Sequence, residues 1–267
     1  MTSAAIDWHI LLPALLAGLL VLATHVPLGA QVLQRGIVFI DLAIAQIAGI
    51  GVIAADAMGL EPQGWAVQAA ALSAALLGAL ALTWTERRWP EIQEALIGVL
   101  FVLASCAGLL LLAGNPHGGE HLKDLLVGQI LWVSNQQLMV MAGLTALVLA
   151  LWFGLRERLG RAGFYLLFAL AVTASVQLVG VYLVFTSLIV PALAVRGLRP
   201  SLRLPLAYAI GGLGYLLGLA LSAHFDLPSG AVVVLVMAGI APVFPWLATR
   251  WAKPSPPATT PDKGRMD

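Results

Sequence analysis

The chain has 267 residues, of which 60% are hydrophobic and only 10% are charged, and its mean hydropathy is +0.94. A soluble domain carries roughly 25% charged residues, so this composition excludes an ordinary soluble protein and indicates an integral membrane protein. The formal net charge of +1 gives no indication of nucleic-acid binding, and a single cysteine excludes an internal disulfide framework.

The apolar residues fall into eight blocks separated by polar or charged connections. Since a helix of about 20 apolar residues crosses a hydrocarbon core of roughly 30 Å, we expect an all-α, polytopic membrane helix bundle. Residues 1–253 are expected to form one transmembrane domain and the Pro-rich residues 254–267 a disordered cytoplasmic tail. The blocks lie near residues 10–33, 37–60, 64–85, 95–114, 122–155, 163–195, 205–223 and 230–250.

The charged connections predict a topology. If the basic connections face the cytoplasm, 13 of the 14 Lys and Arg residues lie there and only Lys123 lies on the far side. The opposite connections hold acidic residues and three of the five histidines. We therefore expect the N-terminus outside and the C-terminus inside the cell.

Four histidines are candidate metal ligands. His25 lies inside the first block, where it is either a packed, neutral, hydrogen-bonded ring or a ligand on a transport path. His117 and His121 belong to the outer sequence HGGEH, and His224 lies in another outer connection near Asp226. For these three, both a metal-binding site and a solvated loop remain open.

The sixth block runs from Ala162 to Val195 without a charge, and its about 34 residues would measure roughly 51 Å as one straight helix. Because basic residues flank both ends, the block must cross the membrane and return. We place the break at residues 177–180, where a side-chain amide and a flexible glycine can satisfy the exposed backbone groups. The total is about eight to nine membrane-embedded helices, and it holds whether residues 125–137 are a re-entrant piece or part of the fifth span.

The segment VQLVGVYLVFTSLIVPALAVR resembles the membrane subunits of ABC importers for zinc and manganese. It is more distantly similar to the corresponding subunits for cobalamin and siderophores. Other segments resemble the same family in the same order along the chain. The five matching segments are 28–52, 94–113, 125–134, 176–196 and 226–239.

The resemblance implies a type II ABC importer fold and a membrane subunit moved by a separate ATPase. Residues 192–203 are expected to form the coupling helix that contacts this ATPase, although they also fit an ordinary arginine-anchored loop. Prolines are expected to interrupt the helices there, glycine to permit a turn, and arginines to meet acidic partner groups. The residues assigned to coupling are Pro191, Arg196, Gly197, Arg199 and Arg203.

The second block departs from the family pattern Gly-Asp-x-x-x-His. Asp41 stands at the usual glycine, Leu42 at the usual aspartate and Gln46 at the usual histidine. Asp41 and Gln46 diverge by about 140° around a helix, so they do not form the family's ligand pair. Both remain candidates for the ion pathway, and Asp41 also fits a structural ion pair with Arg35.

A stripe of small residues in the seventh block, from Ala207 to Ser222, permits close helix approach within the subunit or between two subunits. The sequence contains no P-loop, so ATP is expected on the partner subunit and no cofactor on this chain.

The sequence thus predicts a non-catalytic ABC importer permease for a divalent metal of the zinc or manganese class. Its implied partners are a cytoplasmic ABC ATPase, a second permease copy or paralogue, a periplasmic or lipoprotein solute-binding protein and the lipid bilayer. The alternatives are an ABC permease for another small solute, a secondary transporter and an intramembrane enzyme. The last of these lacks a convincing catalytic constellation in the sequence.

Overall fold

The computed structural model describes residues 8–61, 64–112, 126–155, 158 and 160–244. Two candidate ligands, His117 and His121, and the predicted tail at 254–267 lie outside these residues.

The described chain forms the helical bundle that the composition predicts. Seven of its helices are long and apolar enough to cross a membrane, and two shorter apolar helices, α8 and α10, complete the set found in the described residues. This agrees with the eight to nine membrane-embedded helices expected from the sequence. The elements are α1 (Trp8–Arg35), α2 (Ile40–Ala57), α3 (Trp65–Arg88), η1 (Pro90–Ile92), α4 (Gln93–Leu112), η2 (Ile130–Trp132), α6 (Asn135–Leu155), α7 (Gly160–Val179), α8 (Val181–Val195), α9 (Pro200–Phe225) and α10 (Ser229–Ile240).

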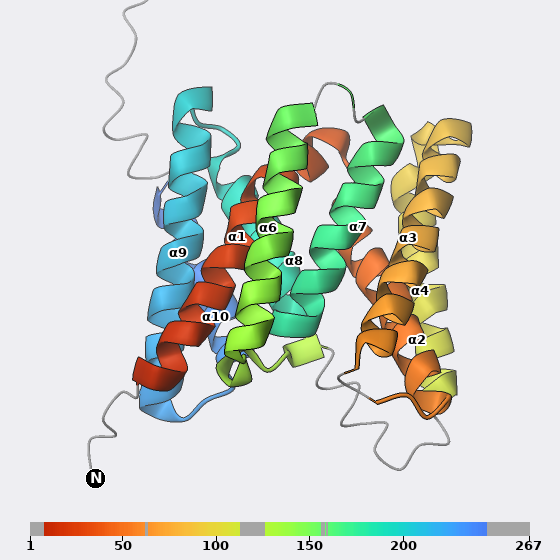
Figure 1. Ribbon diagram of the computed structural model, residues 1–267. Helices are drawn as coiled ribbons and strands as arrows, with labels where there is room; N and C mark the ends of the chain where they lie inside the picture. Colours follow the sequence, from red (N-terminus) through yellow and green to blue (C-terminus); the bar gives the residue numbers. More distant parts are fainter. Residues whose placement is uncertain (1–7, 62–63, 113–125, 156–157, 159, 245–267) are drawn as a thin grey trace, which may run out of the picture.

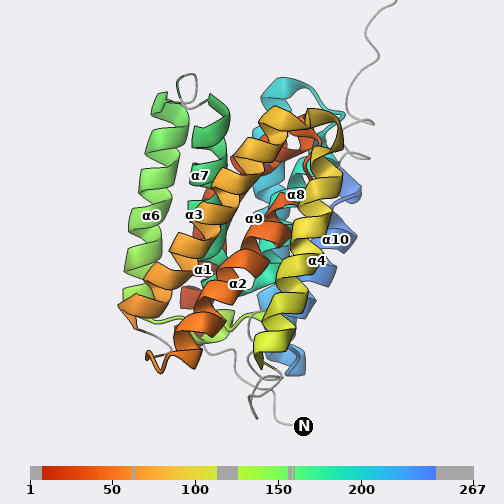
Figure 2. The ribbon, with the colours of Figure 1, turned by 90° about the vertical axis from the view of Figure 1, so that its right-hand side faces the viewer.

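Helix α1 lies near the centre of the bundle. It packs against α6, α7, α8 and α9, while α2 packs against α3, α4 and α7 at one side (Figures 1 and 2). Successive long helices run in opposite directions, so the basic connections gather at one end, the upper end in Figure 1. We call it the basic end; its described arginines are Arg35, Arg87, Arg88, Arg158, Arg161, Arg196, Arg199 and Arg203.

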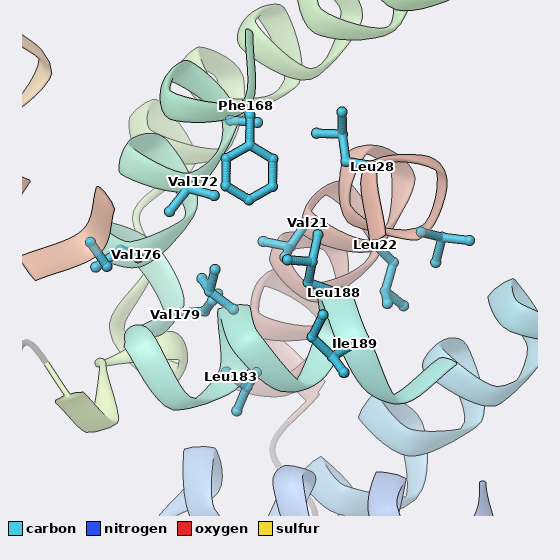
Figure 3. Close-up of a cluster of buried hydrophobic side chains, with 14 of the residues drawn as sticks. Val21, Leu22, Leu28, Phe168, Val172, Val176, Val179, Leu183, Leu188 and Ile189 are labelled. Atoms are coloured by element: carbon cyan, nitrogen blue, oxygen red, sulfur yellow. The ribbon is translucent and has the colours of Figure 1, made fainter. Parts of the chain in front are cut away.

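The core draws buried side chains from most of the described helices, and its centre contains branched aliphatic and aromatic side chains from α1, α7 and α8. Figure 3 shows Val21 and Leu22 of α1 near Leu188 of α8, with Phe168 and Val172 of α7 beside them. All five are buried, with 0 to 1% of their surface exposed. Since lipid tails are as apolar as these side chains, close van der Waals packing is what holds such helices together in a membrane.

The sixth block breaks at Gly180, within the segment that the sequence predicted. Gly180 has φ 83° and ψ 162°, a conformation that residues with a Cβ rarely adopt. Its N–H donates to the Val176 carbonyl at 2.8 Å, and its own carbonyl accepts from the Val184 N–H at 3.1 Å. One residue therefore ends α7 and starts α8, and the backbone itself satisfies the polar groups at the break.

The fifth block is divided rather than continuous from residue 122. The membrane-spanning helix α6 begins only at Asn135, because Ser134 and Gln137 form a capping box ahead of it. The Ser134 N–H donates to Gln137 Oε1 at 2.9 Å, and the Gln137 N–H donates to Ser134 Oγ at 3.2 Å. Residues 126–134 form a separate segment instead, and its Gly128 packs against Gly180 at the α7–α8 turn.

The small residues of α9 serve packing within this subunit. A Cβ added at Gly211 would lie 2.5 Å from Leu22 of α1, and one added at Gly218 would lie 2.6 Å from Val233 of α10. Both glycines are buried, so the stripe lets α9 approach α1 on one side and α10 on another.

Candidate functional site

The predicted coupling residues form a turn between two membrane helices at the basic end. Helix α8 ends at Val195 and α9 begins at Pro200, so a coupling helix running continuously over 192–203 is wrong. Arg199 has ψ 140°, an extended conformation typical of a residue that precedes proline, and Pro200 occupies the first helical position. We call residues 196–199 the basic turn.

The basic turn is exposed but tied to α9. Arg196, Gly197 and Arg199 are exposed, whereas Arg203 is half-buried and its Nε donates to the Leu198 carbonyl at 2.8 Å. The Leu198 N–H in turn donates to the Val195 carbonyl at 3.0 Å. The turn thus presents two arginines to its surroundings on a fixed backbone.

Pro191 does not interrupt the helix as expected. It is buried inside α8, which continues through it to Val195. A proline inside a helix removes one hydrogen bond, and a membrane helix tolerates this because neighbouring helices support the freed carbonyl.

Asp41 lies at the basic end of α2, fully inside the protein. Only 1% of it is exposed, and neither carboxylate oxygen has a hydrogen-bond partner of ordinary geometry. The backbone N–H groups of Asp41 and Leu42 lie close to it in the first helical turn, where the helix dipole favours a negative group.

A second acid lies beside Asp41. Glu94, in the first turn of α4, accepts a hydrogen bond from the Phe39 N–H at 3.3 Å, just ahead of α2. Its Oε2 is buried without a partner. Two helix starts therefore bring two carboxyl groups together.

The expected pairing of Asp41 with Arg35 is not found. Arg35 instead pairs with Glu86 of α3, at 3.7 Å between Nη1 and Oε1, and its guanidinium lies 4.3 Å from the ring centre of Phe164. Arg35 ends α1 whereas Asp41 belongs to the next helix, and the intervening turn at Gly36 directs them to different neighbours.

The sequence did not predict a polar contact near this ion pair. The Gln93 side-chain amide donates to the Leu82 carbonyl at 3.0 Å and to the Tyr165 hydroxyl at 3.2 Å. Gln93 and Tyr165 are 72 residues apart, and no local pattern connects them. The contact joins α3, α4 and α7 at the basic end.

The remaining candidate ligands lie apart from this cluster. Gln46 is half-buried on α2, while His25 is buried in α1. His25 Nδ1 lies 2.9 Å from the Val21 carbonyl and 3.0 Å from Thr24 Oγ1, so the ring is hydrogen-bonded within its own helix, although Nε2 is unpartnered.

His224 is exposed at the opposite end, where its ring packs edge-on against Phe225 at 4.7 Å between centres. Among the residues that the structure describes, no three His, Cys, Asp or Glu side chains come together in a metal-binding group.

The basic end therefore combines three features that transport chemistry can use. It carries an exposed arginine turn joined to two helices, a buried carboxyl group with a half-buried one near it, and a polar contact that joins three further helices. A buried carboxylate offers oxygen ligands to a cation, and an exposed arginine offers a docking point for an acidic protein surface.

Comparison with known proteins gives a consistent result. The model of a family described as the ABC 3 transport family matches residues 7–160 and 153–245. An uncharacterized membrane protein of Synechocystis sp. is 30% identical over 255 residues, covering 87% of this chain and 88% of that protein. The manganese transport system membrane protein MntC of Halalkalibacterium halodurans is 27% identical over 252 residues, covering 86% of this chain and 85% of its own length.

A solved structure has the same fold. It is described as PsaBC from Streptococcus pneumoniae in complex with Fab, and one of its chains aligns with a TM-score of 0.72 and 22% identity, covering 93% of each chain.

Proposed function

The chain belongs to the ABC 3 transport family, and we propose that it is the permease subunit of an importer that moves a divalent metal ion of the zinc or manganese class across a bacterial inner membrane. The family match over residues 7–160 and 153–245 carries this proposal. The similarity to a protein named as a manganese transport system membrane protein supports the choice of a metal cargo.

ATP hydrolysis takes place on a partner. The permease is non-catalytic, and an ABC ATPase docks on the basic turn from the cytoplasm. The exposed Arg196 and Arg199 support this placement, because the turn joins α8 directly to α9 and a push on it reaches both helices. A second permease copy or paralogue completes the pathway, and a solute-binding protein delivers the ion to the opposite end.

Asp41, with Glu94 beside it, is the best-supported ion-pathway candidate on the chain. An acidic residue within a membrane helix is costly and is retained for a function more often than by accident. Both Asp41 oxygens are free to accept a proton or a cation.

Reconstitution of the permease with its ATPase in liposomes tests the proposal. We expect ATP-dependent uptake of manganese or zinc, together with metal-stimulated ATP hydrolysis when the solute-binding protein is supplied. If no divalent metal of a broad panel is taken up or stimulates hydrolysis, the proposal of a metal cargo is wrong. Uptake driven by an ion gradient without the ATPase would instead favour a secondary transporter.

A second candidate cargo is another small solute. It is favoured by the second helix, where Leu42 and Gln46 replace the carboxylate and imidazole of the pattern that the family resemblance implies. The same liposomes discriminate the two, because a non-metal solute would stimulate hydrolysis with Mg²⁺ as the only divalent metal present.

A further inference from the structure

An open groove lies beside the basic turn, between α1, α8 and α9. Its volume is about 350 Å³. Its walls are mostly apolar, with Leu33 of α1, Leu193 of α8 and Leu204 of α9 among them, and its polar lining residues are Gln34, Arg196 and Arg203.

The polar and apolar parts of the groove lie at different depths. On α1 the lining runs from Val26 to Gln34, about 12 Å along the helix at about 1.5 Å per residue. Gln34 and Arg196 lie at the last turns of α1 and α8, so the polar mouth is at the basic end and the apolar walls extend toward the middle of the bundle.

The charge of the groove is uncompensated. None of its lining residues is acidic, and in the described part of the chain neither Arg196 nor Arg203 has a carboxylate partner. Arg203 uses its Nε to hold the Leu198 carbonyl, which leaves its two terminal nitrogens for another acceptor. A ligand that matches this groove is negatively charged at one end and apolar along the rest.

We propose that this groove binds an anionic phospholipid of the inner leaflet, with the phosphate at Arg196 and Arg203 and an acyl chain along the leucines. The assignment to the inner leaflet depends on the proposed function, which places the basic end at the cytoplasmic surface. Basic pockets between membrane helices on that side bind anionic lipid headgroups by charge attraction. A free phosphate ion would leave the apolar walls uncovered, whereas a lipid covers both parts.

A lipid bound in this groove would affect how the permease is coupled to its ATPase. Arg196 belongs to the basic turn, and Arg203 holds that turn through Leu198. A phosphate between the two arginines would fix the end of α8 against the start of α9. The lipid would thus stabilise the element on which the ATPase docks.

Binding of lipid to the purified, delipidated permease tests the proposal without requiring transport. The probes are phosphatidylglycerol and phosphatidylcholine with the same acyl chains, and bound lipid is counted by native mass spectrometry. We expect phosphatidylglycerol to bind at least tenfold more tightly than phosphatidylcholine. Arg196→Ala with Arg203→Ala should reduce phosphatidylglycerol binding to the level of phosphatidylcholine.

Matched controls separate the groove from general surface charge. Arg199→Ala removes an arginine of the same turn that does not line the groove, and it should leave lipid binding unchanged. Arg196→Ala alone should lower the affinity severalfold. Because Arg196 is exposed whereas Arg203 is half-buried, the single variant is expected to fold normally even if the double variant does not. Ala30→Phe, which fills the groove from α1, should weaken binding of both lipids.

Four results would overturn the lipid assignment. Equal binding of the two lipids would remove the role of charge, and an equal loss in Arg199→Ala would indicate diffuse attraction. Full displacement of the lipid by inorganic phosphate would indicate a simple anion site. A double variant that keeps lipid binding but loses its second subunit or its ATPase would assign the groove to that protein instead. The readout is lipid binding to the purified permease, so a failure of the lipid proposal can be told apart from a failure of the metal cargo, which is measured by uptake.

Discussion

Gly128 and Gly180 lie backbone to backbone, where the segment before α6 meets the turn between α7 and α8. A Cβ added at Gly180 would lie 2.6 Å from the carbonyl carbon of Val127 and 2.8 Å from Cα of Gly128. Gly230, at the start of α10, approaches the same Val127 carbonyl from another side. Three chain segments therefore meet at one point without intervening side chains.

We predict that Gly180→Ala destabilises the protein severely. The backbone at Gly180 has φ 83° and ψ 162°, a region essentially restricted to glycine, which alone costs about 1–3 kcal/mol for another residue. The clash with a neighbouring backbone adds to this cost, because no flexible side chain can move away. The measurement is the thermal unfolding midpoint in detergent.

Gly143→Ala is the matched control for that substitution. Gly143 lies within α6, and an added Cβ there meets nothing within 4 Å. Alanine is a better helix former than glycine by about 0.5–1 kcal/mol, so this variant should be as stable as the original or slightly more stable. Equal midpoints for the two variants would contradict the proposed role of the glycine junction.

The break at Gly180 could be predicted because two simple constraints agree. The block is too long for one crossing, and arginines at Arg161 and Arg196 require both ends to lie on the same side. The family resemblance was likewise confirmed, because its matching segments occur in order along most of the chain. Both inferences depend on features that can be read directly along the sequence, namely the length of an apolar block, its flanking charges and the order of matching segments.

The contacts at the basic end could not be predicted, because they join residues far apart in the chain. The Phe39–Glu94 hydrogen bond spans 55 residues, and no spacing rule relates its partners. Arg35 had several possible acidic partners, and the nearest in sequence, Asp41, proved to be the wrong one. The effect of Pro191 was also predicted wrongly. Proline propensity indicates a break in the helix there, but α8 continues through Pro191.

Asp41→Asn should stabilise the protein and reduce metal uptake. The substitution keeps the shape of the side chain and replaces a buried carboxyl group, which has no hydrogen-bond partner of ordinary geometry, by an amide that cannot ionise. An increase of about 1 kcal/mol in the free energy of unfolding would raise the unfolding midpoint by about 2–4 °C in a protein of this size. Uptake in liposomes should fall because a neutral amide attracts a cation less strongly than a carboxylate.

Asp56→Asn provides the comparison for Asp41. Asp56 lies at the other end of the same helix, away from Glu94, and its substitution should change uptake little. Unchanged uptake in Asp41→Asn would restrict Asp41 to a structural role.

Arg35 and Glu86 should show a strong energetic coupling. Arg35→Met removes both the ion pair and the cation–π contact, and it leaves a carboxylate that already has one buried, unpartnered oxygen. Because the side chains remain 23% and 15% exposed, solvent screening limits the loss to about 1–2 kcal/mol. The double variant Arg35→Met with Glu86→Gln should recover part of this stability. Additive losses in a double-mutant cycle would show that the pair contributes nothing.

Arg199→Glu should uncouple the permease from its ATPase while leaving the permease folded. Arg199 is exposed on the basic turn, and its side chain makes no ion pair with any residue that the structure describes. Reversing its charge would place like charges against an acidic docking surface, which costs more than loss of the contact alone. We expect the ATPase to be lost during copurification and metal-stimulated hydrolysis to fall at least tenfold, with an unchanged unfolding midpoint of the isolated permease. Arg161→Glu reverses an exposed charge at the same end, on α7 rather than on the turn, and should retain the ATPase. If both variants lose the ATPase equally, docking depends on the overall charge of the basic end, and the turn has no special role.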